Sequence, residues 1–138
     1  MYMLDTNACI HAIKGAKKDK FAHVTKLFKK KLTEGLSIST ITLAELEYGV
    51  AHSAYPDKNA AALLSFLTPI EILPFDSAAA LAYGTIREDL HRQNLIIGPY
   101  DLLIAAHAKS LDCILVTNNT REFERIDGLS VENWLLAI

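Results

Sequence analysis

The chain has 138 residues, of which 51% are hydrophobic and 22% are charged, and its net charge is −2. This composition is too apolar for a disordered chain and is typical of one globular domain, which we expect over residues 1–138. No apolar run is long enough to span a membrane, residues 1–15 lack the pattern of a signal peptide, and two cysteines make no disulfide framework. We therefore expect a cytoplasmic protein without a membrane anchor. Composition leaves an enzyme and a binding module equally open.

Positive charge is concentrated in one stretch of the sequence. Residues 14–31 hold eight lysines and one acidic residue, a net charge of +7, so the rest of the chain carries −9. Each lysine taken singly is explained by a solvated helix face. Taken as a block, the lysines could hold a phosphate backbone, which keeps an anionic polymer open as a substrate.

Short apolar segments alternate with helical patterns along the chain. In chain order we expect a strand over residues 2–4, helices over 8–14 and 20–33, a strand over 36–39, helices over 42–52 and 59–67, a strand over 70–73, helices over 76–93 and 101–111, and strands over 113–116 and 129–131. This alternation implies an α/β fold with right-handed crossovers and a mostly parallel sheet of four to five strands, covered by helices on both faces. In such folds ligands bind beyond the carboxyl ends of the strands, here near Asp5, Ser39, Asp76 and residues 117–119.

Three acidic residues are candidates for a site at that edge. Asp5 follows the first strand, where helix capping explains it, and Glu45 follows Thr42 at the spacing of a capping box. Asp101 lies in the first turn of its helix, where a negative charge suits the helix dipole. Ile104, Ala105 and Ala108 follow Asp101 by three, four and seven residues, so they share its helix face, which should pack on the sheet. Burial of an unpaired charge is expensive, so this position calls for a partner.

Local capping explains each acid separately but does not explain why all three converge. Two carboxylates ~4 Å apart repel by about 4 kcal/mol at an effective dielectric constant of 20. A divalent cation would relieve this repulsion, and oxygen ligands without cysteine or histidine suit Mg²⁺ or Mn²⁺ rather than zinc. Such an ion can activate a water molecule and stabilise the charge that builds on a phosphate.

Four segments resemble, in order, the motifs of PIN-domain ribonucleases, and most closely those of VapC-type toxins of toxin–antitoxin pairs. They are Met-Leu-Asp-Thr-Asn at residues 3–7, Ser-Thr-Ile-Thr-Leu-Ala-Glu-Leu-Glu-Tyr-Gly at 39–49, Gly-Pro-Tyr-Asp-Leu-Leu-Ile-Ala-Ala-His-Ala at 98–108, and Val-Thr-Asn-Asn-Thr-Arg-Glu-Phe at 116–123. The resemblance covers nearly the whole chain. It implies a three-layer α/β/α sandwich, metal-dependent endoribonuclease activity, a homodimer and a small VapB-like antitoxin partner.

The resemblance also assigns roles to residues. Asp5, Glu45 and Asp101 become the catalytic, metal-binding acids, which would coordinate Mg²⁺ (or Mn²⁺) and activate a water that attacks an RNA phosphodiester. Thr6 and Thr117 become hydroxyl groups that orient the acids or that water. The motif around Asp101 resembles that of relatives that cut tRNA, which suggests the anticodon loop of initiator tRNA as the target.

The chain departs from the family pattern at Asn119, where many relatives carry a fourth acid. An amide can make a weak metal contact but adds no charge, which puts a tightly held second metal in doubt. Glu122 could substitute for the missing acid, but a surface charge explains it as well.

Two other functions stay open. A receiver-like signalling domain would use Asp76 as phosphoacceptor, but it also needs a lysine after a late strand, and residues 117–119 offer none. A PIN-like scaffold that binds RNA or protein without cutting is supported by Asn119.

The remaining candidates have structural explanations. The five histidines show no metal-ligand spacing, and we interpret them as surface or hydrogen-bonded side chains. We interpret Tyr48, Tyr83 and Tyr100 as packing in the core or between protomers, although they could stack bases. We expect both cysteines to be buried and Trp134 to cover the end of the sheet.

Overall fold

The computed structural model describes residues 1–15 and 22–135, and in this part of the chain five parallel strands form one sheet. The strands are β1 (Tyr2–Leu4), β2 (Leu36–Ser39), β3 (Glu71–Leu73), β4 (Ile114–Val116) and β5 (Val131–Glu132). Their order across the sheet is β3-β2-β1-β4-β5, and every neighbouring pair is parallel. The expected parallel sheet is confirmed, and the fifth strand begins two residues later than predicted and ends one residue later.

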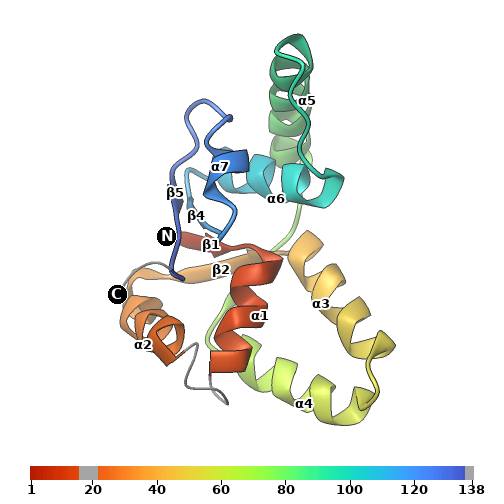
Figure 1. The fold of residues 1–138 in the computed structure, drawn as a ribbon, viewed down its shortest axis with the longest axis vertical. Coiled ribbons are helices and arrows are strands. Elements are labelled where there is room, and N and C mark those ends of the chain that lie inside the picture. Colours follow the sequence, from red (N-terminus) through yellow and green to blue (C-terminus); the bar gives the residue numbers. More distant parts are fainter. Residues whose placement is uncertain (16–21, 136–138) are drawn as a thin grey trace.

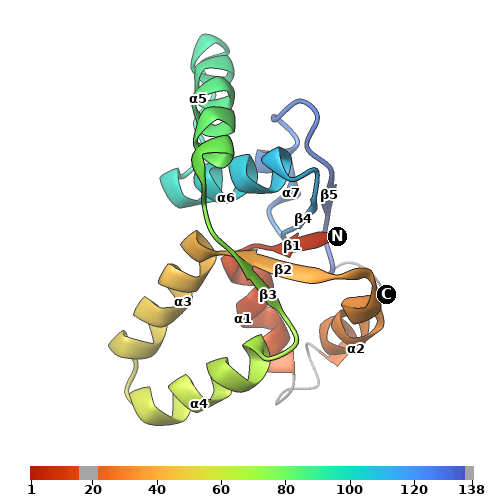
Figure 2. The same ribbon diagram turned by 180° about the vertical axis from the view of Figure 1, so that it is seen from behind.

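Helices cover both faces of this sheet (Figures 1 and 2). They are α1 (Thr6–Gly15), α2 (Ala22–Lys31) with the 3₁₀ turn η2 (Leu32–Glu34), α3 (Thr40–His52), α4 (Pro56–Leu67), α5 (Ser77–Arg92), α6 (Pro99–Ser110) and α7 (Thr120–Phe123). Helices α1 to α4 lie on one face and α5 to α7 on the other, so the expected three-layer α/β/α sandwich is confirmed. No helix in the described residues is long and apolar enough to cross a membrane.

Alternation along the strands produces two separate apolar cores. In β1, Tyr2 and Leu4 pack among α1 to α4, whereas Met3 packs among α5 to α7. Successive strand side chains point to opposite faces, so a strand buried on both sides must be apolar throughout. All three residues of β1 are at most 5% exposed, which places the end of this strand, and the site beyond it, at the centre of the fold.

The strand order excludes the receiver-like alternative. Receiver domains have the order 2-1-3-4-5, in which the first strand lies between the second and the third. Here β1 lies between β2 and β4, so Asp76, which follows β3, lies at the sheet's outer edge rather than beside Asp5.

Several helices begin earlier than the sequence predicted. Helix α3 begins at Thr40 rather than Thr42, since the Ser39 side chain accepts a hydrogen bond from the Ile41 N–H at 3.1 Å. Helices α4 and α6 begin at proline residues, which suit the first turn of a helix. The predicted helix over 20–33 is described from residue 22 and tightens into η2, which ends at Gly35 with φ of 88°.

Candidate functional site

The carboxyl edge of the sheet gathers polar side chains because helices are capped there. Asp5 Oδ1 accepts a hydrogen bond from the Ala8 N–H at 2.8 Å and so caps α1. Ser39 caps α3, and Asp76 caps α5 through the Ala79 N–H at 3.0 Å. In the order 3-2-1-4-5, β2 and β3 are added on one side of β1 and β4 and β5 on the other, so the strand order reverses between β1 and β4. Ligands bind at this point in open parallel sheets. Asp5 follows β1 and Thr117 follows β4, so both lie at this point.

Asp5 is a buried carboxyl group in an unfavourable environment. It is 3% exposed, and burial raises its pKa from 3.8 to about 6. Hydrogen bonds from the Thr117 side chain and the Ala8 N–H oppose this increase in pKa, while the negative charges of Asp101 and Glu45 add to it. The capping interpretation of Asp5 is confirmed, but capping does not require burial beside two further acids.

Glu45 is held against the start of α1. Its Oε1 accepts a hydrogen bond of 2.6 Å from the hydroxyl of Thr6, the first residue of that helix. The capping-box interpretation is wrong, because α3 begins at Thr40 and Glu45 therefore lies beyond its first turn. Helix capping therefore does not explain Glu45. Its side chain instead links α3 to α1 by a hydrogen bond at the carboxyl edge of the sheet.

Asp101 lies at the top of a buried helix face, as the sequence indicated. Ile104, Ala105 and Ala108 on this face of α6 are fully buried, and Asp101 itself is half-buried. Burial raises the pKa of Asp101, and the charges of Glu122 and Glu45 raise it further. The three acids predicted from the sequence therefore lie within electrostatic range of one another.

Glu122 belongs to this group more clearly than Asn119 does. Glu122 Oε1 accepts a hydrogen bond from the Gly98 N–H at 3.1 Å, which connects α7 to the start of α6. The Asn119 amide donates to the same carboxylate, and the Asn119 N–H donates to Thr117 Oγ1 at 3.0 Å. The sequence interpretation left Glu122 as a surface charge. Its position one helical turn after Asn119 was the signal that could have placed it beside the site.

The donor chemistry of the site fits a hard divalent cation. All the groups at this edge offer oxygen atoms, and Mg²⁺ is usually bound through one or two carboxylates while it keeps several waters. Within residues 1–15 and 22–135, no three acidic, histidine or cysteine side chains lie close enough together to form a ready-made ligand set. The arrangement therefore fits an ion held by one or two carboxylates and by water.

The histidine, cysteine and aromatic residues named from the sequence differ in how deeply they are buried. His107 is buried, its Nδ1 lies 2.8 Å from Ser39 Oγ, and its ring packs edge-on against Phe75, so the hydrogen-bonded interpretation is confirmed. Both cysteines are buried, as expected. Trp134 is also buried and packs edge-on against Tyr2, as expected. Core packing is wrong for Tyr48 and Tyr100, which are 68% and 58% exposed.

The lysines of α2 lie away from the acids, whereas Lys14 on α1 lines a groove that Glu45 also lines. Lys17, Lys18 and Lys20 fall outside the described residues. Lys26, Lys29 and Lys30 are exposed on α2, which lies at the amino ends of the strands, opposite the start of α3 (Figures 1 and 2). Lys31, on the same helix, lies 5.2 Å over the ring of Tyr2, the first residue of β1. The lysines of α2 are therefore not part of the acidic site.

Comparison with known proteins identifies the family. The PIN-domain family model matches residues 2–129. The tRNA(fMet)-specific endonuclease VapC of Shigella flexneri is 47% identical over 134 residues, which cover 96% of this chain and 97% of the relative. Among solved structures, VapBC2 from Rickettsia felis bound to a promoter DNA fragment matches with a TM-score of 0.89 and 40% identity, covering 96% of this chain and 98% of the other. DNA-bound VapBC from Salmonella typhimurium matches with a TM-score of 0.88 and 44% identity, covering 96% and 97%. The chain therefore belongs to the PIN-domain family and, within it, to the VapC proteins.

Proposed function

We propose that this protein is the ribonuclease toxin of a VapBC-type pair and that it cleaves RNA with the help of Mg²⁺ or Mn²⁺. The observation that carries the proposal is the buried carboxyl group of Asp5, whose pKa is raised to about 6 beside two further acids. Strongly perturbed acids grouped in this way are typical of functional sites. A structural role alone would favour an uncharged cap, because an Asn side chain caps a helix as well as Asp does.

Each residue has a distinct task in this proposal. Asp5 and Asp101 would hold the cation, with Glu45 reaching it directly or through water. When bound, the ion supplies charge stabilisation on the phosphate and activation of a water nucleophile. Thr6 fixes the Glu45 carboxylate by its 2.6 Å hydrogen bond, and Thr117 fixes Asp5. Glu122 holds the Gly98 N–H at 3.1 Å and so orients the first turn of α6, on which Asp101 lies.

The proposed substrate is initiator tRNA, cut in its anticodon loop. Support comes from the relative in Shigella flexneri, whose name gives tRNA(fMet) as its target, and from the resemblance in the segment around Asp101. An unpaired loop is also the part of a folded RNA whose backbone and bases are most accessible to protein side chains.

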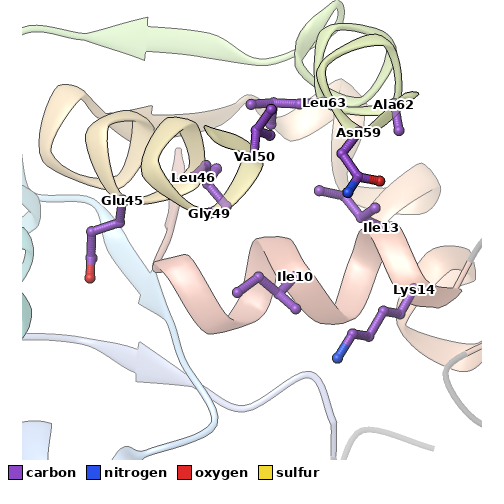
Figure 3. A pocket seen from close by; sticks show the side chains of 10 residues that line it. All are labelled: Ile10, Ile13, Lys14, Glu45, Leu46, Gly49, Val50, Asn59, Ala62 and Leu63. Carbon is purple, nitrogen blue, oxygen red and sulfur yellow. The ribbon is translucent and has the colours of Figure 1, made fainter. Parts of the chain in front are cut away.

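The proposed partner is a VapB-like antitoxin that occupies an apolar groove between α1, α3 and α4. The groove has a volume of about 390 Å³ and is lined by apolar side chains that include Ile10, Ile13, Val50 and Leu63 (Figure 3). Glu45 lies at one end of the groove, so an occupant would lie against one of the acids. This position would explain inhibition by direct obstruction of the site.

We also propose that two copies of the chain associate. Leu81 on α5 and Ile96 before α6 are 75% and 85% exposed. Helices α5 and α6 lie on the opposite face of the sheet from α1, α3 and α4, which line the groove (Figure 1). A contiguous exposed apolar surface marks a contact site, and we propose that Leu81 and Ile96 belong to such a surface. Sedimentation of the wild type and of Leu81→Glu tests this: the wild type should sediment as a dimer and the variant as a monomer.

The central test is cleavage of purified initiator tRNA by purified protein. We expect cutting in the anticodon loop with millimolar Mg²⁺ or Mn²⁺, loss of cutting with EDTA, and recovery with excess metal. An elongator tRNA serves as the control substrate and should stay largely intact. Tight binding of tRNA without cleavage under any divalent ion would instead favour the non-catalytic scaffold.

A further inference from the structure

Helix α3 carries an exposed pair of aromatic rings that the fold itself does not use. The rings of Tyr48 and His52 are stacked, with centroids 5.6 Å apart and planes inclined by only 11°. Tyr48 is 68% exposed and His52 is also exposed, and neither residue packs in either apolar core. A large ring that buries so little of its surface contributes little to folding stability, so it is available for a contact outside the chain.

The pair continues the face of α3 that carries Glu45. Residues three and seven positions apart share one side of a helix, so Tyr48 and His52 follow Glu45 along one strip, away from the buried Thr42 and Leu46. With a rise of about 1.5 Å per residue, Tyr48 lies roughly 4.5 Å further along the axis than Glu45. The rings therefore begin one turn from an acid of the candidate cleavage site.

The charges around the pair favour an RNA base over the RNA backbone. Helix α3 has no lysine or arginine, whereas Glu45 and Glu47 lie on it. A phosphate would find no cation on this helix, but stacking of a nucleobase on an aromatic ring needs none. An unpaired base can leave its neighbours and lie flat on a tyrosine or histidine side chain.

The surroundings also separate this surface from the apolar groove. The groove is lined on α3 by Glu45, Leu46, Gly49 and Val50, and Tyr48 is not among its lining residues. The groove thus suits an apolar chain segment, while the neighbouring strip presents a planar ring pair to solvent. Two adjoining surfaces of different chemistry are suited to two different ligands.

We infer that Tyr48, stacked on His52, is a platform for an unpaired base of the RNA, next to the phosphate that is cut. This inference rests on the proposed ribonuclease function and adds a substrate subsite to it. The platform holds the base by ring stacking, so the phenol hydroxyl of Tyr48 is dispensable and the ring is not.

Binding of a fluorescein-labelled RNA hairpin with the anticodon loop of initiator tRNA tests the inference. The measurements use full-length protein carrying Asp101→Asn, so that the hairpin stays uncut, and follow fluorescence anisotropy. Adding Tyr48→Ala should raise the Kd at least about 5-fold, the low end of what one base–aromatic stack contributes. Tyr48→Phe should change the Kd by less than about 2-fold, because the ring is kept.

Tyr55 provides a matched control. It is 70% exposed in the turn between α3 and α4, and its removal by Tyr55→Ala should leave the Kd unchanged. A fully paired RNA duplex should bind Tyr48→Ala and the parent equally. In the cleavage-competent protein, Tyr48→Ala should raise KM with little change in kcat, as expected when a contact binds substrate and transition state equally.

Several results would overturn the inference. They are a Kd for Tyr48→Ala equal to that of the Tyr55→Ala control, a loss with Tyr48→Phe as large as with Tyr48→Ala, or a change in oligomeric state of Tyr48→Ala on sedimentation. The last result would assign the rings to a protein contact. The test separates this inference from the proposed function. If the protein cleaves RNA equally well with and without the Tyr48 ring, only the platform is wrong. If hairpin binding depends on Tyr48 but no RNA is cleaved, only the proposed nuclease activity is wrong.

Discussion

The two edges of the sheet carry opposite charges and were assembled in opposite ways. At the carboxyl edge, Asp5, Glu45 and Asp101 come from distant parts of the sequence and meet because β1 and β2 end there and α6 begins there. At the amino edge, Lys26, Lys29 and Lys30 are near one another in the sequence and remain solvated on one helix, α2. Residues that cluster along a chain need not serve one site, while residues that are dispersed along it can form one.

The edges also differ in what burial does to charge. Asp5 is almost wholly withdrawn from water, so its ionised form is disfavoured until a cation compensates it. Lys29 and Lys30 keep their charged groups in solvent, where they need no compensation. If RNA cleavage depends on the carboxyl edge alone, changes there should affect it strongly and changes at the amino edge should not.

The largest expected effect is loss of cleavage when an acid at the carboxyl edge is neutralised. Asp5→Asn or Asp101→Asn should lower the rate of initiator tRNA cleavage by about 1000-fold, since either change removes charge from the proposed cation site. Single-turnover cleavage in Mg²⁺ measures this, with Lys29→Gln as the control that should cut normally. A wild-type rate in either acid variant would contradict the assignment.

The second effect is a gain in stability from the same substitution, in metal-free buffer. Asp5 has a pKa of about 6 in the folded state and 3.8 as a model value, so its ionisation above pH 6 costs the folded state about 3 kcal/mol. Asp5→Asn removes this cost and keeps the cap, and should raise the free energy of unfolding at pH 7.5 by roughly that amount. The folded-state pKa is raised, so the advantage should shrink as pH falls from 6 and vanish below 3.8.

Urea denaturation at pH 7.5, 5 and 3.5 measures this pH dependence. Lys30→Gln at the amino edge is the control, and its stability should match the wild type at each pH. A loss of stability in Asp5→Asn at pH 7.5 would mean that the carboxylate is already well compensated in the metal-free protein.

Much of this site could be predicted from the sequence because a polar residue that directly follows a short apolar run marks the carboxyl end of a buried strand. Short apolar runs ending in Asp5 and Thr117 fixed both residues at the carboxyl edge, and the apolar face of α6 placed Asp101 beside the sheet. The helix start at Thr40 was missed, because Ser39 serves both as the last strand residue and as the cap, and patterns rarely place a boundary within two residues.

Other features were not predictable because they depend on contacts between distant elements. The hydrogen bond from the Gly98 N–H to the Glu122 carboxylate joins residues 24 positions apart, and the hydrogen bond from Thr6 to Glu45 joins residues 39 apart. The sequence left Tyr48 open between packing in the core and packing between protomers, and its exposure rules out only the core. Only the placement of α3 against the sheet decides which flank of the helix stays in water.

The third effect compares two buried serines of β2, one at the carboxyl edge and one inside the sheet. Ser39 Oγ accepts from the Ile41 N–H and lies 2.8 Å from His107 Nδ1, whereas Ser37 Oγ donates only to the Tyr2 carbonyl at 2.9 Å. Ser39→Ala should cost about 2 kcal/mol of stability, from the lost cap and an unpaired buried imidazole nitrogen. Ser37→Ala should cost about 1 kcal/mol. If urea denaturation showed equal losses in the free energy of unfolding for both variants, Ser39 at the edge would contribute no more to stability than Ser37 inside the sheet.

The fourth effect concerns the groove beside the carboxyl edge. Gly49 lies in the middle of α3 and lines the groove, and a Cβ added there would meet no atom within 4 Å. Gly49→Leu should therefore fold normally but fill the groove and weaken antitoxin binding at least about 10-fold, which is about 1.4 kcal/mol. Gly84→Leu on α5 is the matched control, because its added Cβ also meets nothing. Calorimetry with the cognate antitoxin should find unchanged affinity for that control.

The smallest expected effect is at the amino edge, and it decides whether the separation of charges is functional. If α2 does not contact a bound anticodon loop, Lys29→Gln combined with Lys30→Gln should change the Kd of the labelled hairpin by less than about 2-fold. Each lysine that neutralised a phosphate would contribute roughly 0.7 to 0.9 to the slope of log Kd against log salt. Titrations at several salt concentrations should therefore give the same slope for the double variant and the wild type. A slope lower by about 1.5 would place the loop across both edges of the sheet, and the lysines would then belong to the substrate site after all.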